Sequence, residues 1–413
     1  MEAAAVIHWS NEARQAIIPP GPNGVFGTEN YGNKFPGEAA VYMGIVHAAI
    51  YDAALAIEGG YEPYAIALEA PRHTSAAAAV ATAAHHTLIG LQPALGLTPA
   101  QQGVLDGRYA DYLAALPDTS SKARGIAVGE RVAQAVLELR EGDGRERNPQ
   151  LEDLDPPPPG PGVWSSGGGA ALGLRLPGMK PLALARAWQF RPHGPLPLSS
   201  QAYAIDFDEV AAFGRADSVV RRADQTAQAL FWTDHDLRQW NDGMLALAAD
   251  TRLGLVETAR MLALAHVAGG DAMIACFDAK YHYMFWRPSA AILLTGADGR
   301  PRSESDATWR PLRATPNHPE YPAAHACHTS AIVEALRTLF GTDEVRISLD
   351  SRTTGTTRSF NRLHEIVEEV EDARVFAGFH FRNSGLTGSR LGHDVARFVA
   401  TRCFRPVPDS GSP

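Results

Sequence analysis

The sequence predicts an all-α protein, and three observations support this fold class. Long alanine-rich stretches carry larger apolar residues at helical spacing, as in GEAAVYMGIVHAAIYDAALAI at residues 37–57. Alternating runs of β-branched residues, which would indicate strands, are nearly absent. The chain has 413 residues and is 45% hydrophobic, which is ordinary for a globular protein large enough to hold two helical bundles.

The expected helices fall into two groups along the chain. An N-terminal helical domain is predicted at residues 1–147, and a C-terminal helical domain at residues 201–406. The segments with the clearest helical periodicity are residues 37–57, 74–92, 121–141, 199–214, 223–240, 254–286, 326–340 and 362–378.

A long connector is predicted between the two domains, at residues 148–200. This segment is crowded with proline and glycine and has no sustained periodicity. Its scattered Trp164, Leu184, Trp188 and Phe190 predict that it lies along the surface of the domains. Residues 407–413 are predicted to be a flexible tail.

Composition excludes several classes of protein. The net charge of -9 argues against a broad basic surface for nucleic acid. No run of about 18 uncharged apolar residues occurs, so no membrane span is expected. The N-terminus lacks the basic start of a signal peptide, so a cytoplasmic location is expected unless a secreted precursor was trimmed. The three cysteines are odd in number and far apart, which predicts no disulfide framework. A homo-oligomeric state is left open.

The stretch KYHYMFWRP, residues 280–288, sets two cations in apolar company. Lys280 and Arg287 are about two helical turns apart, so on one helix ending at Pro288 they point the same way. Four of the 37 basic residues are lysines, which indicates a specific role for Lys280. The two cations are either a surface pair or two arms around an anion.

The stretch NHPEYPAAHACHTSAIVEALRTLF, residues 317–340, predicts a helix whose first residue is Pro322. Free N–H groups of Ala323, Ala324 and His325 would then point out of its N-terminus and form an anion site. His325 is placed to exchange protons with a bound anion.

Two further histidines, His318 and His328, flank His325. The three histidines could be zinc ligands, although they lack the spacing of a recognised zinc motif. Alternatively, His318 and His328 are side chains satisfied within a crowded turn.

The third stretch is ARVFAGFHFRNSG, residues 373–385. Six helical residues turn through about 600°, which would put Arg374 and His380 on different sides of one helix. Joint action of the two therefore requires the helix to break, and Gly378 is the predicted position.

In this order, Lys-x6-Arg-Pro, Pro-x-x-His and Arg-x5-His resemble the signature of the vanadium-dependent haloperoxidases and the type 2 phosphatidic acid phosphatases, which share one fold of helical bundles. Trp286 before Arg287, the HPEYP lead into His325 and the HFR around His380 resemble the haloperoxidase branch.

The resemblance implies a tetrahedral oxyanion site with vanadate as the cofactor, or phosphate in the same place. It implies that His380 binds vanadium directly and that His325 is the acid and base. Lys280, Arg287 and Arg374 would hold the oxyanion, and Lys280 would also polarise hydrogen peroxide. The implied partners are hydrogen peroxide, a halide and a small organic acceptor. The implied product is hypohalous acid or a halogenated organic molecule.

The resemblance also concerns halide choice. His318 stands where similar bromoperoxidases have a histidine and chloroperoxidases a phenylalanine, so with Trp286 it is a candidate halide-tuning residue favouring bromide or iodide. It is equally a loop histidine with no halide role. Two alternative functions are an acid phosphatase acting through a phospho-histidine at His380 and a non-catalytic oxyanion-binding protein.

Two departures from the family pattern concern the site. Ala323-Ala324 stands where relatives usually carry Ser-Gly, so one hydroxyl donor to the oxyanion is lost. A hydrogen bond to a charged group contributes about 1.5–3 kcal/mol, so weaker anion binding is expected. Ser384 replaces the carboxylate that usually orients the vanadium-binding imidazole, which leaves His380 to be fixed by some other acceptor.

Overall fold

The computed structural model describes residues 3–20, 30–294 and 306–407, and these are mainly helical. The N-terminal helices are α1 (Ala3–Ile17), α2 (Pro36–Glu58), α3 (Ala76–Gly90), α4 (Pro99–Ala114) and α5 (Ser120–Leu139). The C-terminal helices are α6 (Gln201–Phe213), α7 (Ala223–Phe231), α8 (Asp236–Thr251), α9 (Leu255–Tyr283), α10 (Pro288–Leu293), α11 (Ala324–Phe340), α12 (Leu363–Phe376) and α13 (Arg382–Arg402). The predicted all-α class is confirmed. Of the predicted tail, residues 408–413 lie outside the described part.

A small hairpin is the exception to the helical pattern. Strands β1 (Ile347–Ser351) and β2 (Thr356–Phe360) pair antiparallel, with Ile347 opposite Phe360. Side chains of β1 alternate between buried and exposed, and Ile347 and Leu349 face inward. This alternation covers only five residues, which is too short to predict a strand from the sequence.

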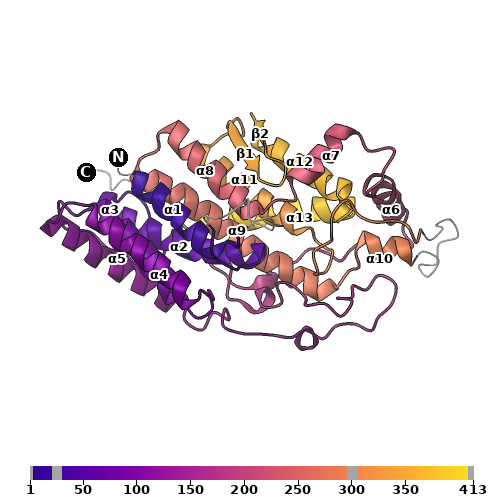
Figure 1. Cartoon of the computed structure of the whole chain (residues 1–413), viewed down its shortest axis with the longest axis horizontal. Helices are drawn as coiled ribbons and strands as arrows, with labels where there is room; N and C mark the ends of the chain where they lie inside the picture. Colours follow the sequence, from indigo (N-terminus) through magenta and orange to yellow (C-terminus); the bar gives the residue numbers. More distant parts are fainter. Residues whose placement is uncertain (1–2, 21–29, 295–305, 408–413) are drawn as a thin grey trace.

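Helix α9 is the centre of the molecule, with the N-terminal helices on one side and α11 and α13 on the other (Figure 1). It packs closely on α2 because glycines face the neighbouring backbone. A Cβ on Gly44 would lie 3.0 Å from the His266 carbonyl oxygen, and one on Gly270 would lie 3.2 Å from that of Ala40. One hydrophobic cluster contains residues of both predicted domains. The division at residues 147 and 200 stays a prediction.

Helices α2 and α9 are also long and apolar enough to cross a membrane. Their most apolar windows are 94% and 100% buried within the protein. Core helices of a large bundle have the same character, so these two helices are weak evidence for a membrane span.

The segment at residues 148–200, the predicted connector, has three short 3₁₀ turns and neither α-helix nor strand. The turns are η1 (Leu151–Leu154), η2 (Leu176–Gly178) and η3 (Ala187–Phe190). Trp164 and Leu184 are buried against the helices as predicted, whereas Trp188 is 53% exposed. The Trp164 N–H donates to the Met284 carbonyl at 2.7 Å, so the connector braces the stretch that carries Lys280 and Arg287.

Asp271 of α9 anchors this connector. Its buried carboxylate accepts N–H bonds from Leu182, Ala183 and Leu184 at 2.5, 2.8 and 2.8 Å. We expect Asp271→Ala to leave these N–H groups unsatisfied and to lower the free energy of unfolding by about 3 kcal/mol, measured by urea denaturation. Asp224→Ala, which removes an exposed surface pair, is the control and should change nothing measurable. Equal stability of both variants would contradict the anchoring role.

Candidate oxyanion site

Helix α9 ends earlier than predicted. Met284 takes a left-handed conformation with φ of 44°, so the helix stops at Tyr283 and does not continue to Pro288. Lys280 therefore lies in the last turn of α9, and Arg287 is the N-cap residue of α10. Both side chains are buried, and both contact the segment at residues 316–322. The side chains of Lys280 and Arg287 thus converge on the same segment, although the two residues do not lie on one helix.

The Lys280 ammonium is bound by backbone carbonyls. Its Nζ donates to the carbonyl oxygens of Pro319, Glu320 and Pro322 at 2.9, 2.9 and 2.5 Å. These bonds use all three N–H donors of the ammonium. Burial, with a smaller effect of the Arg287 charge, lowers the pKa of Lys280 to about 8.

The Arg287 guanidinium links this segment to His380. Its Nε donates to the His318 carbonyl at 3.0 Å, and its Nη1 to the Phe379 carbonyl at 3.0 Å. Nη1 also lies 3.1 Å from Nε2 of His380. The bonds tie the loop before α11 to the turn before α13.

Glu320 orients His380, a role that the sequence analysis did not assign. His380 Nδ1 lies 3.0 Å from Oε1 of Glu320, which also accepts the Phe381 N–H at 3.0 Å. The Ser384 hydroxyl donates to Oε2 at 2.7 Å. The carboxylate assigns the proton to Nδ1 and leaves the Nε2 lone pair facing Arg287. Glu320 therefore supplies the acceptor that Ser384 lacks.

The break predicted at Gly378 is confirmed. Helix α12 ends at Phe376, and Gly378 takes a φ of 76°. Beyond it, the Phe379 N–H returns to the Arg374 carbonyl at 3.1 Å. Arg374 donates from Nη1 to the Trp232 carbonyl at 2.7 Å, while its buried Nε has no hydrogen-bond partner among the described residues.

We expect Gly378→Ala to disturb the site more than the fold. An added Cβ would lie 2.5 Å from the Gly214 carbonyl oxygen, at a backbone conformation that costs about 1–2 kcal/mol for a non-glycine residue. The turn should shift His380 away from Arg374 and weaken oxyanion binding at least tenfold, measured by calorimetry. Gly341→Ala, at a φ of 68° with open space around it, is the matched control. Equal binding by the two variants would contradict this prediction.

Helix α11 begins at Ala324 and not at Pro322, with Ala323 as its N-cap. The Ala323 N–H donates to the Ser384 carbonyl at 2.9 Å. The prediction that this N–H is free to bind an anion is therefore wrong. The N–H groups of Ala324 and His325 lie in the first turn and have no acceptor within the helix. The backbone N–H groups available to an anion are therefore those of Ala324 and His325, and the N–H of Ala323 is not among them.

His325 is a neutral imidazole at neutral pH. Burial, followed by the Arg374 charge, lowers the pKa of His325 to about 3. Its buried Nε2 has no hydrogen-bond partner in the described part of the chain. The ring nitrogen is therefore open to a proton, although the lowered pKa makes the imidazole a weak base.

Asp236, the first residue of α8, is a second acidic neighbour that the sequence analysis missed. Its buried carboxylate lies 3.0 Å from Nδ1 of His328. Although burial opposes this, the interaction with His328 holds the pKa of Asp236 well below its usual value. No residues near Asp236 in sequence indicated this pairing, because α8 and α11 meet only in the folded chain.

The zinc alternative is wrong for the part of the chain that the structure describes. There, no group of three or more His, Cys, Asp and Glu side chains is placed to hold a metal ion. His328 pairs with Asp236, whereas the His318 ring lies 5.1 Å from the Phe277 ring and 3.1 Å from Arg287 Nη2.

Trp286, the other candidate halide-tuning residue, is buried in an aromatic cluster. Its Nε1 donates to the Tyr203 hydroxyl of α6 at 3.1 Å. This bond fixes the indole one residue before Arg287. A role of His318 or Trp286 in halide choice stays a prediction.

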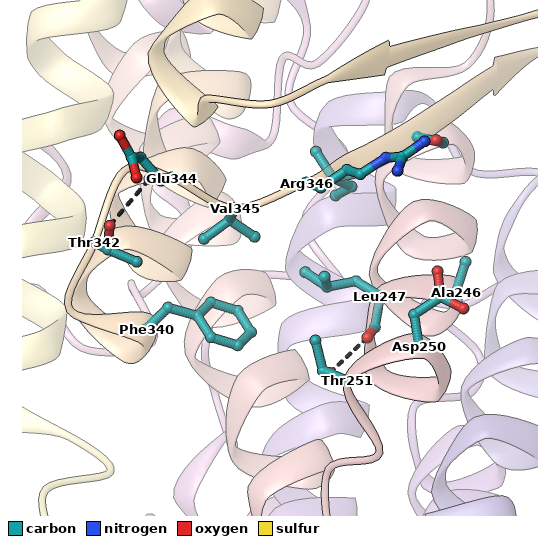
Figure 2. Close-up of a pocket in the computed structure, with 11 residues that line it drawn as sticks. Ala246, Leu247, Asp250, Thr251, Phe340, Thr342, Glu344, Val345 and Arg346 are labelled. Atoms are coloured by element: carbon teal, nitrogen blue, oxygen red, sulfur yellow. Dashed lines mark hydrogen bonds between the residues drawn. The ribbon is translucent and has the colours of Figure 1, made fainter.

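The three predicted cations act on one imidazole. After burial, the charges of Arg287, Lys280 and Arg374 lower the pKa of His380 well below its usual value. A different cavity has a volume of about 620 Å³. It is lined by residues of α8, the end of α11, the loop at residues 342–346 and the start of β1 (Figure 2). None of the predicted site residues lines that cavity. The candidate site is the buried cationic cluster.

The C-terminal part of the chain, which carries the candidate site, is similar to a known protein family. Residues 260–408 match the family model of the second helical-bundle domain of vanadium chloroperoxidase. The vanadium chloroperoxidase of Curvularia inaequalis is 29% identical over 147 residues, covering 29% of this chain and 24% of the relative. The match thus spans about a quarter of that relative's length.

Solved structures share the fold over nearly the whole chain. A bacterial vanadium-dependent iodoperoxidase has a TM-score of 0.74 at 20% identity, over 99% of this chain and 98% of its own. An apo-type bacterial vanadium-dependent chloroperoxidase has a TM-score of 0.68 at 16% identity, over 94% and 96% of the two chains.

Proposed function

We propose that this chain, which belongs to the vanadium-dependent haloperoxidase family, binds vanadate at His380 and uses hydrogen peroxide to oxidise a halide. One observation carries the proposal. Glu320 holds the Nδ1 side of His380, while Arg287 Nη1 lies 3.1 Å from Nε2 and the charges of Arg287, Lys280 and Arg374 act on the ring. A neutral imidazole with its lone pair in a cationic pocket is suited to ligate the metal of an oxyanion.

The residues present fit vanadate. Nε2 of His380, released from Arg287 Nη1, would be the ligand, and the unpartnered Nε of Arg374 would donate to an oxygen. Lys280 and Arg287 would each exchange a carbonyl for an oxyanion oxygen, since all the donors of Lys280 are already bonded. Bound vanadate would supply the Lewis-acid centre that activates hydrogen peroxide for attack by halide.

The protein's own groups would manage the protons. The overall reaction, hydrogen peroxide plus halide plus one proton, gives hypohalous acid and water. His325 enters unprotonated, because burial and the Arg374 charge lower its pKa. It would accept a proton as hydrogen peroxide binds. The same imidazole then returns the proton to the departing oxygen. The Lys280 ammonium stabilises negative charge on that oxygen.

Bromide or iodide is the proposed halide, and a small organic molecule the proposed acceptor. His318 lies against Arg287 and the Phe277 ring, which offers a polarisable halide an apolar and cationic environment. One structural relative is an iodoperoxidase, which supports this choice, whereas the chloroperoxidase relatives do not.

The test uses the purified chain loaded with vanadate, with hydrogen peroxide, bromide and a phenol acceptor. We expect bromination that needs vanadate, declines when phosphate competes, and exceeds the rate with chloride. Absence of vanadate-dependent oxidation of bromide and iodide, in protein that binds vanadate, would reject the peroxidase function.

An acid phosphatase is the second candidate, because the same Nε2 lone pair could attack phosphorus. Hydrolysis of a phosphate ester that vanadate inhibits, without halide oxidation, would favour it. Oxyanion binding with neither activity would favour a non-catalytic binding protein.

Oxyanion affinity should decline as pH rises through about 8, the lowered pKa of Lys280. The ammonium becomes neutral there, and loss of one charged hydrogen bond weakens binding by about tenfold or more. Folding stability changes the other way. Between about 8 and the usual 10.5 the unfolded chain binds more protons, so the Lys280 contribution to stability rises with pH.

Vanadate titration at several pH values measures this effect. Lys280→Met is the comparison, since it binds more weakly at pH 7 but lacks the titrating group. Both proteins meet the same change in vanadate protonation, so equal pH slopes would rule out the Lys280 contribution.

A further inference from the structure

A pair of buried thiols lies directly beneath the proposed site. Cys276 of α9 and Cys327 of α11 are both fully buried, and their sulfur atoms are 2.7 Å apart. A covalent disulfide is about 2.05 Å long, so the fold holds two free thiols close to bonding distance. The two residues are 51 positions apart in sequence, which is why the sequence analysis predicted no pairing.

The pair is connected to the site through one carbonyl. The Cys276 thiol donates to the Pro322 carbonyl at 3.7 Å, and Lys280 Nζ donates to the same oxygen. Cys276 lies one helical turn before Lys280, and Cys327 lies two residues after His325. Hydrogen peroxide that reaches Lys280 would therefore arrive next to the thiols.

We propose that Cys276 and Cys327 form a disulfide when the protein meets hydrogen peroxide, which joins the Lys280 turn of α9 to the first turns of α11. One sulfur attacks a peroxide oxygen and the O–O bond breaks. The departing oxygen takes the thiol proton and leaves as water. The second thiol attacks the sulfenic sulfur, the S–S bond forms, and hydroxyl and proton leave as a second water. Two thiols are oxidised by two electrons, and one peroxide is reduced.

The surroundings argue against metal binding by this pair and keep the resting thiols protonated. Among the described residues no third His, Cys, Asp or Glu side chain joins the thiols as a metal ligand. Burial and the neighbouring Cys276 raise the pKa of the Cys327 thiol, which protects the resting pair, and the Lys280 ammonium opposes this shift. The inference goes beyond the proposed function, and it needs neither vanadate nor halide.

The experiment treats the whole purified chain with hydrogen peroxide in the absence of vanadate and halide. Catalase ends the reaction, the protein is denatured, free thiols are alkylated, and intact mass and peptide maps are recorded. We expect a peptide carrying Cys276 joined to one carrying Cys327, two fewer alkylated thiols, loss of two hydrogen atoms, and reversal by a reductant. The thermal midpoint should rise by several degrees, because the cross-link closes a long loop.

Cys403 is the internal control, because it is only partly buried. Cys403→Ser should keep the cross-link, and Cys327→Ser should lose it. Full alkylation of Cys276 and Cys327 under peroxide that oxidises Cys403, or their separate conversion to sulfinic acids, would overturn the proposal. Since no vanadate is present, this outcome is distinguishable from failure of the haloperoxidase function.

Discussion

His380→Ala is expected to lose vanadate binding by more than about 100-fold, because removal of a direct ligand costs more than the 10–100-fold typical of an outer partner. The fold should survive this change. The Glu320 carboxylate keeps the Phe381 N–H on one oxygen and the Ser384 hydroxyl on the other, so it is not left unsatisfied. Calorimetric titration with vanadate and a urea denaturation curve measure the two effects separately.

His282→Ala is the matched control, since His282 lies two residues from Lys280 in α9 but is exposed. It should bind vanadate as the unchanged protein does. Added imidazole should restore part of the affinity of His380→Ala by entering the space left by the ring. If His380→Ala bound vanadate normally while folded, the site would be assigned to the wrong residues.

The residues whose roles follow from local chemistry were predictable from the sequence. The helix break at Gly378 is an example. Gly378 is the one glycine between Arg374 and His380, and glycine adopts a left-handed conformation more readily than other residue types. The long helices were predictable for the same reason, since their apolar spacing is a property of neighbouring residues. The helix predicted at residues 37–57 and the observed helix α2 agree within one residue at each end.

Contacts between distant segments were not predictable in this way. Glu320 is separated from His380 by 60 residues, and Asp236 from His328 by 92. A single chain carries no signal for such pairs, although a glutamate between two prolines in HPEYP is an unusual place for a buried charge. The end of α9 was missed because Met284 adopts a left-handed conformation that its type does not favour.

Glu320→Gln is expected to weaken vanadate binding by about 10–100-fold, the range for a partner that orients a metal-ligating histidine. The amide oxygen can still accept from His380 Nδ1 and the Phe381 N–H, so the ring keeps its place. What is lost is the negative charge that makes Nε2 a better electron donor. Loss of that charge also favours an oxyanion nearby, but the charge lies on the far side of the ring, where Phe381 and Ser384 already stabilise it.

Opposite effects on binding and stability distinguish this role from a structural one. Burial, opposed by the Ser384 hydrogen bond and by Arg287, raises the pKa of Glu320 from 4.5 to about 7. Between these values the folded chain binds more protons than the unfolded one, so this group's contribution to stability is lost as pH rises towards 7. Glu320→Gln removes that loss and should be at least as stable as the unchanged protein above pH 7, while it binds vanadate more weakly. Ser384→Ala, which keeps the pairing of Glu320 with His380, should weaken binding much less. A Glu320→Gln variant that loses stability and affinity together would show a structural role and reject the positioning role.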